Sequence, residues 1–261
     1  MARKRFGQHF LHERGVIDRI LAAVNANADD RMVEIGPGEG ALTEPLLDRL
    51  DQLSVIEIDR DLIARWADRA AQRKGLEVIA GDALGIDYGA LAERRAGPLR
   101  LVGNLPYNIS SPLLFALLTS TAKITDMHFM LQKEVVDRMV AAPGSRDYGR
   151  LSVAIAARAE ASLLFDVGPG AFRPPPRVMS SVVRLVPRPP DFVIDDTRMF
   201  DRIVTAAFGQ RRKTLRNGLK RFLDAETIAA CDVDPSERAE QLAAADFARL
   251  ANAAARATDV G

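Results

Sequence analysis

From residue 31 onward, short apolar runs alternate with stretches that have the spacing of amphipathic helices. The apolar runs lie at 32–35, 54–58, 76–80, 99–102 and 127–131, with helical spacing at 41–50, at 60–73 and from 112. Strands that alternate with helices predict βαβ units and a parallel sheet covered on both faces. The sequence therefore predicts an α/β fold whose ligands bind at the carboxyl ends of the strands.

The pattern changes near residue 148. A helical stretch covers 148–160, and two further strands are expected at 163–167 and 178–186. After the prolines of 187–190, only helical patterns follow, at 198–208, 212–223 and 238–256. We predict a large domain over 1–195, which includes a basic arm at 1–20, and a small all-helical domain over 196–261.

Composition excludes several classes of protein. A chain of 261 residues with 48% apolar residues can bury a core and is not disordered. The single cysteine, Cys231, excludes an intrachain disulfide and a cysteine-rich zinc site, and it suits a reducing compartment. No apolar run approaches the ~20 residues of a membrane span, and no secretory signal is recognisable. We therefore expect a cytoplasmic protein.

Charge is distributed unevenly although the net charge is only +1. Residues 1–20 carry +3 and residues 198–222 carry +7, whereas 223–261 carry −5. In the predicted helix 212–223, Arg212, Arg216 and Lys220 form one stripe beside an apolar stripe. Two short basic segments on a mainly acidic chain indicate a polyanionic partner, such as a nucleic acid.

Three signals stand where predicted strands end. The segment 36–40 (GPGEG) would let a ligand approach the backbone near a helix N-terminus. Glu57 lies 21 residues after Gly36, where a carboxylate can accept both hydroxyls of a ribose. Asp82 could accept a hydrogen bond from an adenine amino group. These signals fit NAD and S-adenosylmethionine (SAM) equally.

The tetrapeptide Asn104-Leu105-Pro106-Tyr107 favours SAM. It has the (Asn/Asp)-Pro-Pro-(Tyr/Phe) form of amino methyltransferases, with Leu105 at the second position. An exocyclic amine is a poor nucleophile, because its lone pair is delocalised into the ring. The Asn104 side-chain oxygen and the Leu105 carbonyl can accept its two N–H groups and favour a tetrahedral nitrogen. Pro106 stiffens the turn, and Tyr107 offers a stacking face worth ~1–3 kcal/mol.

The chain resembles the KsgA family, the small-subunit ribosomal RNA adenine N6,N6-dimethyltransferases. The matching segments lie between Arg3 and about Leu223: 5–11 (RFGQHFL), 34–38 (EIGPG), 55–60 (VIEIDR), 103–110 (GNLPYNIS), 172–180 (FRPPPRVMS) and 210–217 (QRRKTLRN). The resemblance implies a Rossmann-like class I SAM-dependent methyltransferase fold with a small all-helical C-terminal domain. It also implies the substrate, two adjacent adenosines in the loop of the 3′-terminal hairpin of 16S rRNA, each dimethylated during small-subunit biogenesis.

The resemblance further implies roles for single residues. SAM contacts are expected at His9, Leu11, Gly36, Gly38, Glu57, Asp82 and Asn104. The target base is expected at Asn104, Leu105, Pro106 and Tyr107, with Phe172 stacking opposite Tyr107. RNA contacts are expected at Arg3, Lys4, Arg5, Arg211, Arg212, Lys213, Arg216 and Lys220. His9 departs from the family pattern, which has Asn at this position.

Three other functions stay open on the sequence alone. A 23S rRNA adenine methyltransferase would share most of these motifs, although the segment 210–217 and the length of the helical domain favour the small-subunit target. A non-catalytic ribosome assembly factor could keep the fold, and an NAD oxidoreductase could use the glycine segment. We expect a monomer that binds 16S rRNA in the small subunit or its precursor, with no metal and no membrane.

Overall fold

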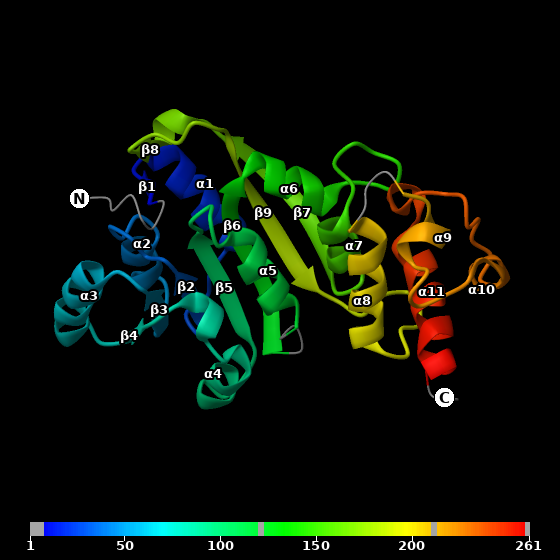
Figure 1. Cartoon of the computed structure of the whole chain (residues 1–261). Coiled ribbons are helices and arrows are strands. Elements are labelled where there is room, and N and C mark those ends of the chain that lie inside the picture. The colour runs from blue at the N-terminus through cyan, green and yellow to red at the C-terminus, as the bar shows by residue number, and fades with distance from the viewer. Residues whose placement is uncertain (1–7, 120–122, 210–212, 259–261) are drawn as a thin grey trace. The chain divides into compact units, whose positions relative to one another are not determined.

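The computed structural model describes residues 8–119, 123–209 and 213–258 (Figure 1). These residues form two compact units. The first lies within Met1–Val136 and Glu160–Pro187, and the second within Asp137–Ala159 and Arg188–Gly261. Within the described ranges, no helix is long and apolar enough to span a membrane.

A seven-stranded mixed sheet forms the centre of the first unit, in the order β4-β3-β2-β5-β6-β9-β7 (Figure 1). The strands β4, β3, β2, β5 and β6 run parallel, and β9 joins β6 in antiparallel orientation. The central strands β2 and β3 are buried along their whole length, as parallel strands covered on both faces must be. The bounds are β2 Met32–Ile35, β3 Leu53–Glu57, β4 Leu76–Ala80, β5 Leu99–Asn104, β6 Ile124–Gln132, β7 Ala159–Val167 and β9 Ser180–Pro187.

Helices connect the strands, and a separate two-stranded ribbon pairs β1, Phe10–Leu11, with β8, Phe172–Arg173. The helices of this part are α1 Arg14–Val24, α2 Thr43–Leu47, α3 Arg60–Gln72, α4 Tyr88–Arg94, α5 Ser110–Leu118 and α6 Lys133–Val140, with 3-10 turns η2 Ala83–Gly85 and η4 Pro169–Ala171. Asp59 begins α3 by accepting the N–H of Asp61, a side-chain cap that ends β3 cleanly. The predicted α/β fold, in which strands alternate with helices, is thus confirmed, and the strand β9 makes the sheet mixed rather than wholly parallel.

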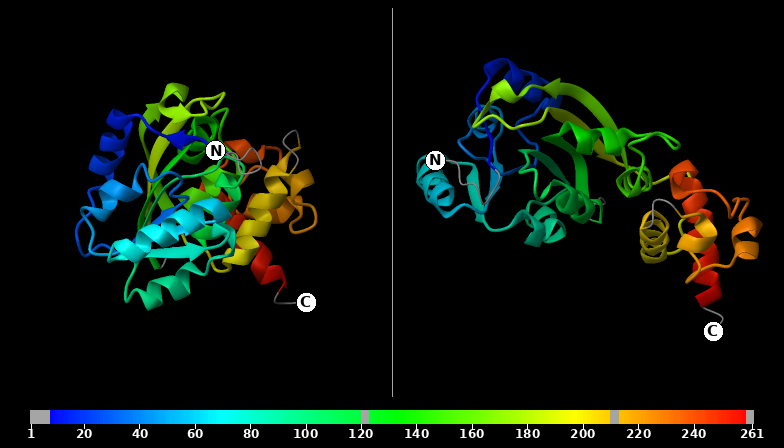
Figure 2. Two further views of the ribbon diagram at one scale, coloured as in Figure 1. Left: turned by 90° about the vertical axis from the view of Figure 1, so that its left-hand side faces the viewer. Right: turned by 45° about the horizontal axis from the view of Figure 1, so that its top comes forward.

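The second unit is helical (Figure 2). Its only described strand residue is Ala159, the first residue of β7. The helices are α7 Arg150–Ala156, α8 Thr197–Phe208, α9 Leu215–Gly218, α10 Ala225–Ala230 and α11 Ala244–Thr258, with the 3-10 turn η5 Ala239–Gln241. Residues of α7 share one core with α8 and α11, and the buried Tyr148 donates its hydroxyl to the carbonyl of Leu242 at 2.8 Å. The two units therefore do not divide at the predicted domain boundary of 195/196. Residues 137–159 belong to the helical unit, because the apolar face of 148–157 packs on the later helices.

The predicted helix over 212–223 is much shorter in the structure. Within the described residues, α9 ends at Gly218, and Leu219 forms its C-cap. Glycine inside a helix costs about 1 kcal/mol relative to alanine, which disfavours continuing the helix through Gly218. Leu219 and Leu223 are both buried although they lie beyond the end of α9. The expected helical stripe of Arg212, Arg216 and Lys220 is therefore wrong, and Arg212 lies outside the described residues.

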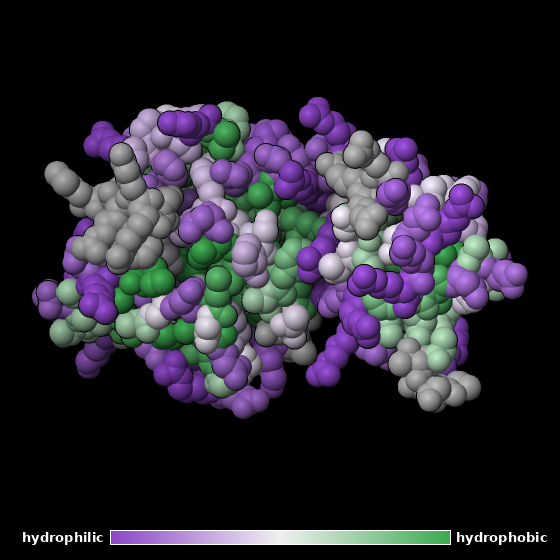
Figure 3. Space-filling view, in the orientation of Figure 1, coloured by the Kyte–Doolittle hydropathy of each residue, from purple (hydrophilic) through white to green (hydrophobic). Residues whose placement is uncertain are grey.

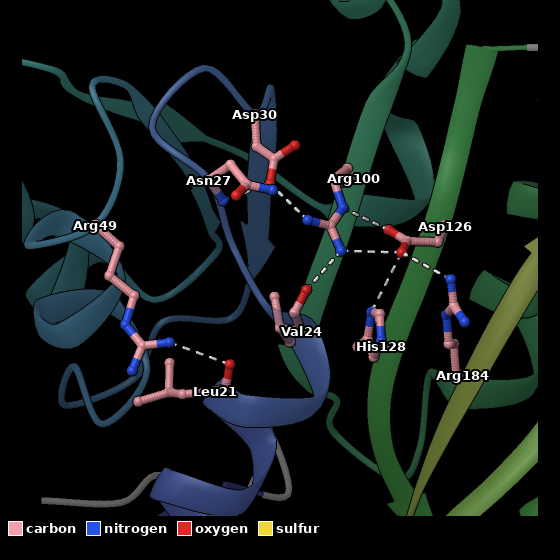
Figure 4. Close-up of polar contacts among 9 residues, drawn as sticks. All are labelled: Leu21, Val24, Asn27, Asp30, Arg49, Arg100, Asp126, His128 and Arg184. Carbon is pink, nitrogen blue, oxygen red and sulfur yellow. Dashed lines mark hydrogen bonds and ion pairs between the residues drawn. The ribbon is translucent and has the colours of Figure 1, made fainter.

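A buried charge cluster ties α1 to the amino ends of β5 and β6 (Figure 4). Arg100 on β5 makes a bidentate pair with Asp126 on β6, at 2.8 and 3.0 Å, and donates to the carbonyl of Val24 at 2.6 Å. Its third partner is Asp30. His128 is 3% exposed beside this cluster, with Nδ1 3.9 Å from Asp126. The cluster lies at the amino ends of the strands, opposite the edge where ligands are expected.

Acid is expected to weaken the fold through His128. Burial lowers the pKa of His128 from 6.5 to about 4, with Asp126 opposing and Arg100 and Arg184 adding to this shift. Between about pH 6.5 and 4, His128 is protonated in the unfolded chain but neutral in the folded one. The free energy of unfolding therefore decreases as the pH falls through this range. The measurement is the melting temperature of wild type and His128→Gln across this window. A variant that loses stability as steeply as wild type would contradict this role.

Candidate active site

The carboxyl ends of β2, β3 and β5 meet at one edge of the sheet. Ile35 lies opposite Ile56, and the Gly36 N–H donates to the carbonyl of Ile56 at 2.9 Å, which closes the first turn against β3. A cleft of about 720 Å³, open mouth included, begins at this edge. Its walls come from the glycine segment, from β2, β3 and β5, and from the chain that follows β5.

The glycine segment is held by a buried tryptophan. Gly36, Gly38 and Gly40 have φ of +71°, +53° and +97°, a region that favours glycine. The indole N–H of Trp66 donates to the Gly38 carbonyl at 3.1 Å, and a Cβ at Gly40 would stand 2.8 Å from the same ring. Trp66 thus leaves no room for a side chain at Gly40 and holds the Gly38 carbonyl beside the cleft.

Glu57 presents an ordered carboxylate to the cleft from the end of β3. The side chain is 5% exposed, and Oε1 accepts the N–H groups of Ile58 and Asp59, each at 2.9 Å. Burial raises the pKa of Glu57, and the backbone N–H groups of Asp59, Ile58 and Gly38 partly offset this. Two amides on one oxygen fix the orientation of the carboxylate toward a ligand.

A second buried carboxyl, Glu34, also lines the cleft and was not singled out from the sequence. It lies within β2, is 1% exposed, and its Oε2 has no hydrogen-bond partner among the described residues. Burial raises the pKa of Glu34 to about 8; the Thr43 side chain opposes this shift and Glu57 adds to it. The available signal was a carboxylate inside an otherwise apolar strand, two positions before the glycine segment begins.

The lining of the cleft is acidic. Glu39 and Glu57 contribute carboxylates to it, the buried Glu34 keeps its proton up to about pH 8, and none of the described lining residues is lysine or arginine. A diphosphate would meet repulsion from these carboxylates, because no lysine or arginine among the described lining residues balances its charge. The lining favours a ligand that carries positive charge and lacks phosphate.

Asn104 ends β5 with its amide held in one orientation. Its Nδ2 donates to the backbone carbonyl of His9 at 2.8 Å. A carbonyl only accepts hydrogen bonds, so the amide nitrogen must face His9, and Oδ1 stays available as an acceptor. The backbone of His9, which precedes α1, therefore orients the Asn104 side chain, which the sequence analysis predicts to contact the reacting nitrogen.

The same N-terminal segment closes one side of the cleft. The His9 ring donates through Nδ1 to the carbonyl of Pro174 at 2.7 Å and lies 5.5 Å from the Tyr107 ring. Phe10 lies beside Gly38, where a Cβ would stand 3.0 Å from its ring. Pairing of β1 with β8 holds this segment next to the proline loop. His9 thus contacts both the tetrapeptide and the proline loop.

The tetrapeptide turn is rigid. The Pro106 carbonyl accepts the Ser110 hydroxyl at 3.0 Å, and the Leu105 N–H donates to the Met130 carbonyl at 3.1 Å. The Tyr107 hydroxyl shares a hydrogen bond of 2.7 Å with Ser180 at the start of β9. Burial raises the pKa of Tyr107, with Ser180 opposing, so the phenol stays protonated at neutral pH. Tyr107 is therefore a fixed aromatic face and not a base.

The structure brings most of the expected site residues to this cleft. Those that line it are His9, Leu11, Gly36, Gly38, Glu57, Asn104, Leu105, Pro106 and Tyr107. Asp82 is exposed, does not line the cleft and caps η2 by accepting the N–H of Leu84 at 3.0 Å. Phe172 is 2% exposed and packs in the core with Leu11, so it does not face Tyr107 across the cleft in this conformation.

The expected RNA contacts fall in two classes. Lys213, Arg216 and Lys220 are exposed on the second unit. Arg3, Lys4, Arg5, Arg211 and Arg212 lie outside the described residues.

Comparisons with known proteins agree over nearly the whole chain. Residues 1–256 match the family model described as ribosomal RNA adenine dimethylase. A Xanthomonas axonopodis pv. citri protein named ribosomal RNA small subunit methyltransferase A is 58% identical and covers 96% of this chain and 95% of its own length. The namesake from Xanthomonas campestris pv. campestris strain B100 is 56% identical over the same shares.

Two solved structures resemble the fold over similar lengths. A dimethyladenosine transferase from Plasmodium falciparum gives a TM-score of 0.75 at 27% identity and covers 93% of this chain and 96% of that chain. The 23S rRNA methyltransferase ErmE gives 0.69 at 25% identity and covers 94% and 98%. The fold is thus shared with a protein named as a dimethyladenosine transferase and with one named as a 23S rRNA methyltransferase.

Proposed function

The chain belongs to the ribosomal RNA adenine dimethylase family, and on this premise we propose that it methylates N6 of adenosine in small-subunit ribosomal RNA, with SAM as methyl donor. We infer that the targets are two adjacent adenosines in the loop of the 3′-terminal hairpin of 16S rRNA, each of which receives two methyl groups. The carrying observation is the orientation of Asn104, whose Oδ1 is left free to accept from an amine. The small-subunit target rests on the 58% identical relative, because the fold alone is shared with a 23S enzyme.

The residues of the cleft fit SAM. SAM carries a sulfonium and an ammonium group and no phosphate, which suits a lining with the carboxylates of Glu39 and Glu57 and no described lysine or arginine. We assign the ribose hydroxyls to Glu57 and the backbone contacts to Gly36, Gly38, His9, Leu11 and Asn104. Asp82 uses Oδ1 to cap η2, and we assign its other oxygen to the adenine amino group. The same lining argues against NAD, whose diphosphate would be repelled.

SAM supplies a methyl group on a carbon that is already activated, so the protein mainly has to align the nucleophile. The Asn104 Oδ1 and the Leu105 carbonyl accept the two N–H groups of the adenine amine and favour its tetrahedral form. Tyr107 stacks on the base. Phe172 could stack from the other side only after its side chain leaves the core. The proton lost from nitrogen goes to water, because Tyr107 is held as a neutral phenol.

We assign RNA binding to the basic segments, with contacts at Arg3, Lys4, Arg5, Arg211, Arg212, Lys213, Arg216 and Lys220. Lysine and arginine near phosphate release counterions, so substrate affinity should fall steeply with salt. The helical region 196–261 holds five of these residues and would be the larger part of that surface.

The proposed function is tested with tritiated SAM and small ribosomal subunits assembled from unmethylated rRNA. Dimethyladenosine in the 3′-terminal hairpin, located by primer extension, is the expected result. Naked 23S rRNA and large subunits serve as the matched substrates for the alternative target. SAM binding without transfer to any of these would favour a non-catalytic assembly factor, and absence of SAM binding would overturn the cofactor.

A further inference from the structure

A basic groove lies on the second unit, between α8 and residues 217–222. One face of α8 lines the groove, with residues at helical spacing: 201, 202, 205 and 206, followed by the C-cap residue 209. The opposite wall comes from Asn217 and Gly218 of α9 and from the chain that follows. Its volume is about 700 Å³, within the ~300–1,000 Å³ of a typical small-molecule pocket. The chemistry of the lining, rather than the size, therefore indicates what the groove binds.

The floor of the groove is small and the rim is cationic. Ala206, Gly209 and Gly218 contribute little or no side chain to it. Arg202, Lys220 and Arg221 line it and are exposed, and no described acidic side chain pairs with them. Hydrophilic residues, in purple, gather over the face that carries α8 and α9 (Figure 3). Such a groove admits a polyanionic strand and neutralises its charge.

One acidic residue also lines the groove, but its charge is already paired. Asp201 lies 2.7 Å from the guanidinium of Arg158, which is 13% exposed. Because Arg158 neutralises it, Asp201 does little to repel an approaching phosphate. The net charge of the lining is therefore positive.

An aromatic ring stands among the cations. The Arg202 guanidinium lies 5.1 Å from the centre of the Phe222 ring, and Phe222 is only partly buried. Single-stranded nucleic acids are bound by grooves that combine cations for phosphates with aromatic or guanidinium planes for bases. The exposed amide of Asn217 can also donate to and accept from base edges or 2′-hydroxyls.

We propose that this groove binds a single-stranded segment of the ribosomal RNA substrate, with Arg202, Lys220 and Arg221 on phosphates and a base against Phe222. The proposal rests on the proposed function for the identity of the RNA. An acidic peptide segment is the other occupant that such charge would accept, but it gives no use for the ring beside Arg202. The groove thus adds Arg202, Arg221 and Phe222 to the RNA contacts expected from the sequence.

The test uses the full chain and the double variant Arg202→Glu/Arg221→Glu. The first probe is a fluorescein-labelled single-stranded RNA of roughly 12 nucleotides, read by anisotropy over a salt series. In a plot of the logarithm of the association constant against the logarithm of salt concentration, each phosphate contact on single-stranded RNA contributes about −0.7 to the slope. Loss of two contacts should therefore make the slope less negative by roughly 1.4. The control is Arg256→Glu, which makes the same charge change on an exposed arginine of α11 outside the groove.

Two further readouts separate the possible outcomes. With unmethylated small subunits, KM should rise at least about tenfold while kcat at saturation changes less than about twofold, because Arg202 and Arg221 do not line the cleft. Phe222→Leu, which keeps an apolar side chain on the core, should weaken RNA binding about tenfold with an unchanged salt slope. Wild-type slope and KM in the double variant would overturn the proposal.

The outcome also distinguishes the groove from the proposed function. If wild type transfers no methyl group but the double variant still loses RNA affinity, the groove stands and the proposed reaction fails. If RNA binding is unaffected and binding of labelled oligoglutamate is lost, the groove takes an acidic peptide and the proposal is wrong.

Discussion

Replacing Asn104 by alanine is expected to lower kcat for methyl transfer by about 10²–10³-fold, the usual cost of losing one preorganised polar group at a reacting centre. The Asn104 amide is oriented before substrate binds, because Nδ2 donates to the His9 carbonyl. The variant loses the acceptor for the adenine amine and leaves the rest of the cleft lining in place. SAM affinity, measured by calorimetry, should change only a few-fold.

Asn108→Ala is the matched control. Asn108 belongs to the same turn but is exposed and does not line the cleft. It should keep turnover near that of wild type. Normal turnover in Asn104→Ala would remove Asn104 from the reaction, and an equal loss in Asn108→Ala would show that the turn itself had been disturbed.

Replacing Glu34 by glutamine is expected to stabilise the protein without cofactor, increasingly as pH rises. The folded state holds the Glu34 proton up to about pH 8, whereas the unfolded chain releases it near 4.5. Wild-type stability from this group therefore falls as pH rises from about 4.5 to 8, and the glutamine amide escapes that loss. At 1.36 kcal/mol per pKa unit, the free energy of unfolding of Glu34→Gln exceeds that of wild type by at most about 5 kcal/mol. This corresponds to a melting temperature of the variant on the order of 10 °C higher.

The measurement is the melting temperature of both proteins at about pH 5 and about pH 9, on either side of the window set by Glu34. Glu39→Gln is the control, because Glu39 lines the same cleft but is exposed. His128 acts in the opposite direction below pH 6.5, so only the difference between each variant and wild type isolates one group. A Glu34→Gln advantage that does not grow with pH would contradict the assignment.

The positions of the site residues along the chain could be predicted because the strands are parallel. Their carboxyl ends share one edge, so Gly36, Glu57 and Asn104 had to converge once the strands were recognised. The apolar runs of β2, β3 and β5 are visible in the sequence because both faces of each strand are buried. Fold class and most of the cleft follow from this local pattern.

What the sequence did not predict depends on contacts distant along the chain. Nothing local shows that Phe172 faces the core or that Asp82 is used as a cap. Glu34 was overlooked because its burial depends on neighbouring strands. The short α9 arises where Leu219 and Leu223 pack into the helical core rather than along one helix face.

The pairing of β1 with β8 affects how the protein is made. The His9 and Pro174 partners lie 165 positions apart, so during translation the first segment emerges long before the strand that it must join. Contacts of such sequence separation carry a large loop-closure entropy and form late in folding. A nascent or truncated chain that stops short of Phe172 would have the glycine turn and the tetrapeptide, but no closed cleft around them. Competence to modify ribosomal RNA therefore arises only after most of the chain has left the ribosome that makes it.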